Sequence, residues 1–89
     1  MIKANITISN KLGLHARASA KLTKLATTFK CDVAMSRNGR RVNAKSIMGV
    51  MMLAAGMGVT VEVETIGERE QEALGAIVAL MNDKFGEGE

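Results

Sequence analysis

His15, the only histidine of this 89-residue chain, is the residue whose type and setting best fit a chemical role. It directly precedes a helical pattern that begins at Ala16, and Arg17 follows two positions later. The start of a helix has unpaired backbone N–H groups and the positive end of the helix dipole, so it attracts anions. A neutral imidazole is nucleophilic near neutral pH, and a guanidinium holds phosphate oxygens in a planar fork. These residues favour phosphate chemistry at His15.

Spacing alone leaves a second interpretation of His15 open, in which the ring is a simple helix-entry residue or packs with its nitrogens satisfied. No second histidine and no cysteine lies near it in the sequence, which argues against a metal site. No acidic residue lies near it either, which argues against a hydrolase triad. Because no nucleotide-binding loop or zinc-ligand spacing occurs, we expect neither a metal nor a cofactor.

A second candidate segment begins at Ser46 and continues as the apolar run Ile47-Met48-Gly49-Val50-Met51-Met52-Leu53. Ser46 is predicted to be the N-cap of a short helix, a position where a phosphate group also gains from the helix dipole. The simplest interpretation of the serine is the cap alone, and that of the methionines is core filling. However, a short helix cannot bury all these apolar side chains on one side. We therefore expect an exposed apolar patch that docks a partner.

Four strands and three helices are expected to position these segments. Alternation of apolar and polar residues predicts strands at 2–9, 31–36, around 42–44 and at 59–64, and Asn38-Gly39 predicts a hairpin turn between the second and third. Periodicity predicts helices from about Ala16 to about Thr28, from Ser46 until Gly56 and Gly58 stop it, and from Glu68–Glu70 through Met81. Residues 86–89 are predicted to be a frayed tail.

Each predicted strand alternates, so each buries only one face. One sheet with all the helices on one side satisfies this pattern. A length of 89 residues supports one core, so residues 1–89 are predicted to form a single domain.

Composition excludes several classes of function. The only aromatic residues are two phenylalanines, which argues against a base-stacking surface for nucleic acid. The longest apolar stretch, 47–57, is too short to span a bilayer. A lone cysteine permits no internal disulfide, and no signal-peptide pattern opens the chain. We therefore expect a cytoplasmic protein that neither inserts into membranes nor binds nucleic acid.

The charge is distributed unevenly along the chain. The net charge is +3, with most basic residues between Lys3 and Lys45 and most acidic residues after Glu62, which suits an acidic partner or a phosphate ligand. The simplest interpretation of six basic side chains is a solvated face: Arg17, Lys21, Lys24, Arg40, Arg41 and Lys45.

Two segments together resemble the signatures of the HPr phosphocarrier family of the sugar phosphotransferase system. They are Leu14-His15-Ala16-Arg17 and Lys45-Ser46-Ile47-Met48-Gly49-Val50. Either motif alone is weak, but the pair is specific in a chain of this size, and the resemblance covers nearly the whole length and element order. It implies an α+β fold, an open-faced β-sandwich with a four-stranded antiparallel sheet and three helices on one face (β-α-β-β-α-β-α).

The resemblance also implies roles for individual residues. His15 would accept a phosphoryl group on Nδ1 from Enzyme I and pass it to IIA domains, so the protein would depend on partner enzymes rather than act as an independent catalyst. Arg17 and the backbone N–H groups of Ala16 and Arg17 would hold the phosphate. Ser46 would be the regulatory target of HPr kinase/phosphorylase where that enzyme exists.

The implied docking surface consists of an apolar patch with a basic rim. Ile47, Met48 and Met51 would form the patch, and Lys24 would lie on the rim. A monomer suits a protein that presents one small face to several partners in turn.

The chain departs from the family pattern at two positions. Ala18 stands where most members have proline, and alanine is also compatible with a first helical turn. Leu12 stands where many members have a small polar residue able to cap toward the histidine. The stretch Asn-Lys-Leu-Gly at 10–13 instead resembles the nitrogen-related branch, NPr. Two alternatives therefore stay open: a nitrogen-related regulatory carrier, and a non-transferring binding module of the same fold, which the presence of His15 disfavours.

Overall fold

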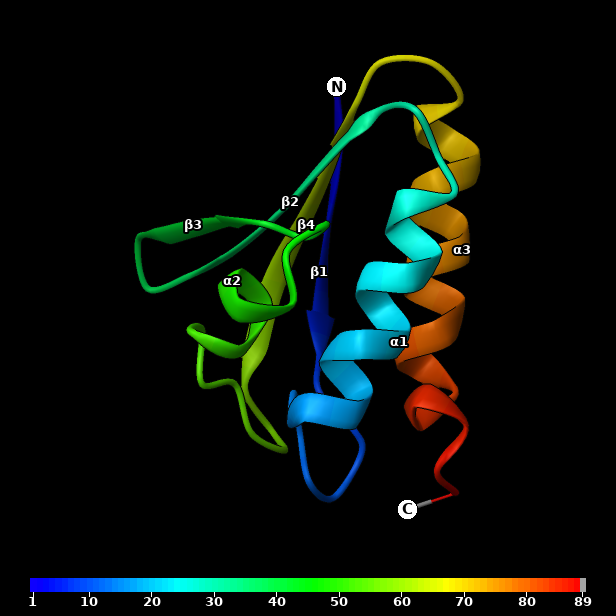
Figure 1. Cartoon of the computed structure of the whole chain (residues 1–89). Coiled ribbons are helices and arrows are strands. Elements are labelled where there is room, and N and C mark those ends of the chain that lie inside the picture. The colour runs from blue at the N-terminus through cyan, green and yellow to red at the C-terminus, as the bar shows by residue number, and fades with distance from the viewer. Residues whose placement is uncertain (89) are drawn as a thin grey trace.

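The computed structural model describes residues 1–88 and has one sheet covered on one face by helices (Figure 1). The strands are β1 (Ile2–Thr7), β2 (Asp32–Arg37), β3 (Arg40–Asn43) and β4 (Thr60–Ile66). The helices are α1 (Ala16–Thr27), α2 (Ile47–Met51) and α3 (Glu70–Asn82), followed by the 3₁₀ turn η1 (Lys84–Gly86). All strand pairs are antiparallel, in the order β1-β4-β2-β3. The predicted α+β open-faced sandwich is confirmed.

The core lies between the sheet and the helices. In the central strands, Val63 of β4 is opposite Ala4 of β1 and Met35 of β2. Alternation along each strand directs such residues toward the helices. The largest side chains in the core include Ile8, Leu22, Met35, Ile77, Met81 and Phe85. Within residues 1–88, no helix has the length and apolar character needed to cross a membrane.

The β2–β3 hairpin confirms the predicted turn and also supports α2. Asn38 and Gly39 have φ values of +51° and +80°, as this kind of tight turn requires. Nη1 of Arg37 donates to the carbonyls of Leu53 and Ala54, at 2.9 Å each. Arg40 donates to the carbonyl of Met52 at 3.1 Å. The hairpin thus donates hydrogen bonds to the carbonyl groups that follow the end of α2. Without these arginines, those carbonyls would depend on water for their hydrogen bonds.

Helix α2 is shorter than the sequence pattern predicts. It ends at Met51 rather than near Gly56, and the chain then passes through Ala54 with a φ of +51°. Leu53 turns into the core, where it is buried. The apolar run therefore contains a short helix and an inward turn. The carbonyls of Met52 and Leu53, at the end of the run, accept hydrogen bonds from Arg40 and Arg37 rather than from a continuing helix.

The structure corrects two expectations, one about the basic side chains and one about the C-terminal residues. Arg41 pairs with the buried carboxylate of Glu64 at 2.5 Å, and Nζ of Lys45 donates to the carbonyl of Phe29 at 2.8 Å, so neither is part of a merely solvated face. The predicted frayed tail is also wrong at Gly86 and Glu87, because Phe85 enters the core, Gly86 ends the 3₁₀ turn and Glu87 forms hydrogen bonds with Asn10 and His15. Residue 89 lies outside the described residues.

Candidate functional site

His15 is the N-cap residue of α1. Its backbone is extended (φ −73°, ψ 177°), and its carbonyl accepts the first helical hydrogen bond from the N–H of Ser19 at 2.9 Å. Its side chain makes no capping bond to the helix. The N–H groups of Ala16 and Arg17 therefore have no intrahelical acceptor, and they lie where the helix dipole favours an anion.

The loop before His15 is fixed against the loop after α2. Gly13 has a φ of +66°, and a Cβ there would lie 2.6 Å from both the carbonyl oxygen of Ala55 and the Cα of Gly56. The N–H of Leu14 donates to the same carbonyl of Ala55 at 2.9 Å. Glycine is needed at position 13 for both its conformation and this close approach. The contact links the entry of α1 to the exit of α2.

An open pocket with a basic lining surrounds the imidazole. Its other lining residues include Lys11, Leu12, Arg17 and Lys21. The His15 side chain is 27% exposed, so it is accessible but partly held by its surroundings. Lys21 also donates to the carbonyl of Phe85 at 2.7 Å and so ties the C-terminal segment to α1. Three cations beside one imidazole create a positive potential that suits a phosphoryl group.

An acidic side chain that sequence reasoning missed completes this pocket. Oε2 of Glu87 lies 2.6 Å from Nε2 of His15, although the two residues are 72 positions apart. Oε1 of Glu87 accepts a hydrogen bond from Nδ2 of Asn10 at 3.0 Å. The fully buried Asn10 also donates to the carbonyl of Gly13 at 2.8 Å. Glu87 carries no local sequence signal, and only the apolar Phe85 indicates that the tail is anchored.

The environment of Glu87 favours its ionised form. The hydrogen bond from the Asn10 amide lowers the pKa of the Glu87 carboxyl below its ordinary value, and burial opposes this shift. The hydrogen bond and charge of His15 and the charge of Lys21 lower that pKa further. A carboxylate therefore faces Nε2 of the imidazole and can only accept a hydrogen bond from it.

Ser46 is the N-cap of α2, as predicted. Its backbone is extended, and its Oγ accepts a hydrogen bond from the N–H of Gly49 at 3.1 Å. The side chain that resembles a regulatory serine therefore also stabilises the helix that it begins.

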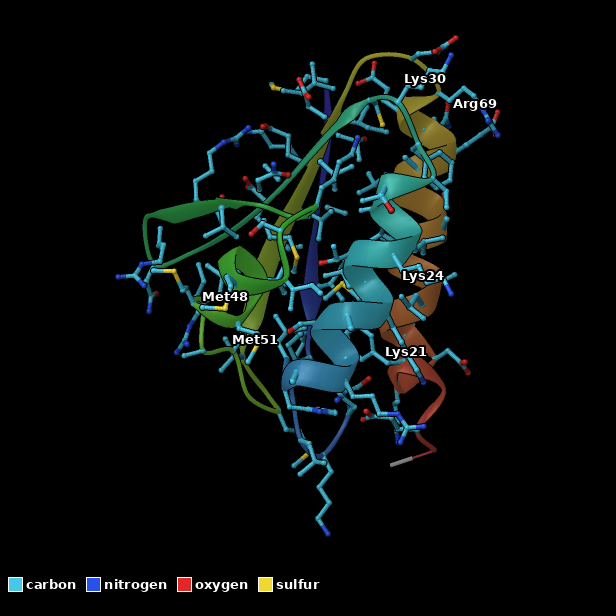
Figure 2. All side chains as sticks on the ribbon, in the orientation of Figure 1. Lys21, Lys24, Lys30, Met48, Met51 and Arg69 are labelled. Carbon is cyan, nitrogen blue, oxygen red and sulfur yellow. The ribbon has the colours of Figure 1, made fainter. Side chains whose placement is uncertain are left out.

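The predicted exposure of apolar side chains around Ser46 is confirmed. We define the α2 patch as Ile47, Met48 and Met51, all of which are exposed, with Met48 at 69%. Figure 2 shows Met48 and Met51 on α2, beside α1 with Lys21 and Lys24. Met52 and Met57, which are not among the predicted docking residues, are also exposed.

Comparison with known proteins identifies close relatives. The family model described as "PTS HPr component phosphorylation site" matches residues 2–83. The phosphocarrier protein HPr of Cupriavidus necator is 66% identical over all 89 residues of both chains, and that of Neisseria meningitidis serogroup A is 56% identical over the same span. The phosphocarrier protein NPr of Shewanella violacea is 41% identical over 97% of this chain and 94% of its own length. A crystal structure of HPr from Thermoanaerobacter tengcongensis matches with a TM-score of 0.95 at 41% identity, covering 98% of both chains.

Proposed function

This chain belongs to the HPr phosphocarrier family of the phosphotransferase system, and from that premise we propose that His15 is its phosphorylated residue. In this proposal His15 accepts the phosphoryl group from phosphorylated Enzyme I and passes it to IIA domains. The observation that carries the proposal is the position of the only histidine, partly exposed at an open helix N-terminus and surrounded by Lys11, Arg17 and Lys21. Monomeric state stays a prediction.

The proposed transfer proceeds at Nδ1, the ring nitrogen that Glu87 does not contact. The lone pair of Nδ1 forms a bond to phosphorus while the bond between phosphorus and the donor atom breaks. Catalysis of this kind depends on positioning and on stabilising the charge of the phosphoryl oxygens. The guanidinium of Arg17 and the N–H groups of Ala16 and Arg17 supply donors for those oxygens. Transfer to a IIA domain reverses the same step.

The direct test is phosphorylation of the purified protein by phosphoenolpyruvate, magnesium and Enzyme I, followed by intact-mass measurement before and after mild acid. We expect a gain of one phosphate that acid removes, because the bond from phosphorus to nitrogen is acid-labile. The variant His15→Ala should gain nothing while keeping its circular dichroism spectrum. Undiminished labelling of this variant would refute the assignment of His15.

We also propose that the α2 patch, with Lys24 on its rim, is the docking surface for Enzyme I and the IIA domains. The exposure of Met48 supports this assignment, since its side chain stabilises little of the fold. Met48→Ser should raise the KM for transfer from Enzyme I with little change in folding stability. Ile66→Thr is the matched control, because Ile66 is an exposed apolar residue in β4, outside the patch. Equal KM values for both variants would place docking elsewhere.

Regulation at Ser46 is the third part of the proposal, with HPr kinase/phosphorylase as the modifying enzyme where it exists. A phosphate there adds negative charge at the edge of the α2 patch. Ser46→Asp should therefore slow transfer from Enzyme I. Ser46→Asn is the matched control, because asparagine also caps a helix but carries no charge. Equal transfer rates for the two variants would contradict an electrostatic effect of modification at Ser46.

A nitrogen-related carrier is the second candidate, favoured by the stretch at 10–13 that resembles NPr. The higher identity to HPr sequences, 66% against 41%, supports the sugar system instead. Initial rates of phosphorylation by Enzyme I and by its nitrogen-related counterpart would decide between them. Failure to accept phosphate from either enzyme would indicate the remaining alternative, a module that only binds.

A further inference from the structure

Glu87, which contacts His15, lies beyond the part of the chain that matches the family model, whereas His15 lies within it. That match ends at residue 83, whereas Oε2 of Glu87 lies 2.6 Å from Nε2 of His15. The Glu87 side chain is 14% exposed and that of His15 is 27% exposed. The carboxylate is thus more sheltered from solvent than the imidazole that it contacts, unlike a typical surface pair.

Three anchors hold Glu87 in this position. Phe85, two residues earlier, is buried in the core, and its carbonyl accepts a hydrogen bond from the ammonium group of Lys21 at 2.7 Å. The second carboxylate oxygen of Glu87 accepts a hydrogen bond from the side-chain amide of Asn10 at 3.0 Å. Asn10 is itself fully buried and is fixed by the carbonyl of Gly13 at 2.8 Å. Each oxygen of Glu87 therefore has its own partner, and the carboxylate cannot shift without breaking one of these bonds.

The chemistry of this arrangement determines which nitrogen of the neutral ring carries the proton. An ionised carboxylate has no proton to donate, so Nε2 must be the donor in the hydrogen bond between them. A neutral imidazole has a single N–H, and its hydrogen bond selects the tautomer. With the proton on Nε2, the lone pair is on Nδ1.

We propose that Glu87 is a positioning residue that holds His15 in the Nε2–H tautomer and presents the Nδ1 lone pair to the phosphoryl group. The inference rests on the proposed function of His15. When the bond from Nδ1 to phosphorus forms and the bond from phosphorus to the donor breaks, the proton on Nε2 stays in place. The hydrogen bond to Glu87 therefore persists through the transfer. Leu12, which is 67% exposed and has no polar side-chain atom, offers no alternative partner for the ring.

The test combines a spectroscopic readout with a kinetic one on the full chain. The ¹⁵N chemical shifts of both His15 ring nitrogens, measured where the ring is neutral, report the tautomer directly. We expect only the Nε2–H form in the wild type and a mixture of both forms in Glu87→Ala. The kcat for phosphorylation by Enzyme I should fall about tenfold in Glu87→Ala, within the range for losing an orienting partner of histidine at metal sites. The KM should not change, because Glu87 is not part of the α2 patch.

Two further variants separate positioning from simple anchoring of the tail. Glu87→Gln keeps an acceptor for the Nε2–H and should restore part of the tautomer preference and part of the rate. Glu68→Gln removes one negative charge just before the start of α3, whereas the tail follows the end of that helix (Figure 1), and it should change neither. A Glu87→Ala protein that keeps the pure Nε2–H form and the wild-type kcat would overturn the inference, even if its melting temperature falls. A wild-type chain that takes no phosphate would overturn the proposed function as well, so the two failures are distinguishable.

Discussion

Helices α1 and α2 begin in opposite ways, although both start at a residue proposed to carry phosphate. The hydroxyl of Ser46 accepts the N–H of Gly49, so α2 satisfies one of its own first-turn donors. The ring of His15 makes no such bond and contacts Glu87 instead, so α1 keeps its first-turn donors free of an intrahelical partner. A helix start can therefore stabilise the fold or receive an anion, according to what its N-cap side chain contacts.

The difference in length explains why α2 needs its cap and α1 does not. Five residues form barely more than one turn, and such a short helix is unstable without external contacts. Ser46 supports α2 at its start, and Arg37 and Arg40 bind the carbonyls that follow its end. The twelve residues of α1 include a buried stripe, so packing holds that helix while its N-terminus stays open.

The largest expected effect comes from giving α1 the same type of start as α2. His15→Ser and His15→Ala should both lose acid-labile phosphorylation completely. Both also lose the contact to Glu87, so they differ mainly in the cap. His15→Ser should be about 1 kcal/mol more stable than His15→Ala, because serine is a good N-cap. Urea unfolding measures this difference, and equal stabilities would mean that a serine at position 15 does not cap α1.

The next effect concerns the close approach of Ala55, in the loop after α2, to Gly13, in the loop before α1. Gly13→Ala should lower the free energy of unfolding by about 3 kcal/mol, because it adds a clash to an unfavourable φ. Gly39→Ala is the matched control, since Gly39 has a similar positive φ of +80° but open space around it. It should cost only about 1 kcal/mol. Similar losses of unfolding free energy in the two variants would show that the protein accommodates a Cβ at position 13 next to Ala55 without an added cost.

A smaller effect tests the cap of α2 directly. Ser46→Ala should lower the free energy of unfolding by about 1 kcal/mol. Ser46→Asn should stay close to the wild type, because its side-chain oxygen also accepts the N–H of Gly49. Chemical denaturation of both variants measures the two values. A Ser46→Ala protein as stable as Ser46→Asn would remove the contrast between the two helix starts.

The smallest effect is a dependence of folding stability on pH, caused by the Glu87 carboxylate at the start of α1. The start of α2 has a serine hydroxyl in place of such a group. The pKa of Glu87 is lowered from its ordinary value of 4.5, first by the Asn10 amide and then by His15 and Lys21. Its contacts therefore stabilise the folded protein fully above about pH 4.5, and this contribution is lost as the pH falls through the lowered pKa.

The side-chain amide signals of Asn10 in NMR spectra should report this step. They should shift in the wild type as the pH falls below 4.5 and stay constant in Glu87→Gln. The glutamine variant isolates Glu87 from Glu64 and Glu72, whose pKa values are also lowered, chiefly by Arg41 and Arg69. A shift that persists in Glu87→Gln would assign the transition to another group.

Features that depend on near neighbours in the chain could be predicted from the sequence. The hairpin at Asn38-Gly39 follows from residues that tolerate positive φ. The cap at Ser46 and the exposure of Met48 follow from a hydroxyl before a short apolar run. The order of strands and helices follows from periodicities of two and of about 3.6 residues. Such signals are local, so a single sequence is enough to find them.

The order of the elements, the position of His15 before a helix and the position of Ser46 as a cap all follow from the amino-acid sequence. The contacts that these residues make follow from the folded chain. Glu87 reaches His15 across 72 positions, Arg37 binds the carbonyl of Leu53, and Ala55 approaches Gly13. The physical reason is that these contacts depend on how the core aligns distant segments. Burial of Phe85 brings the tail to α1, and no periodicity near residue 87 records that arrangement.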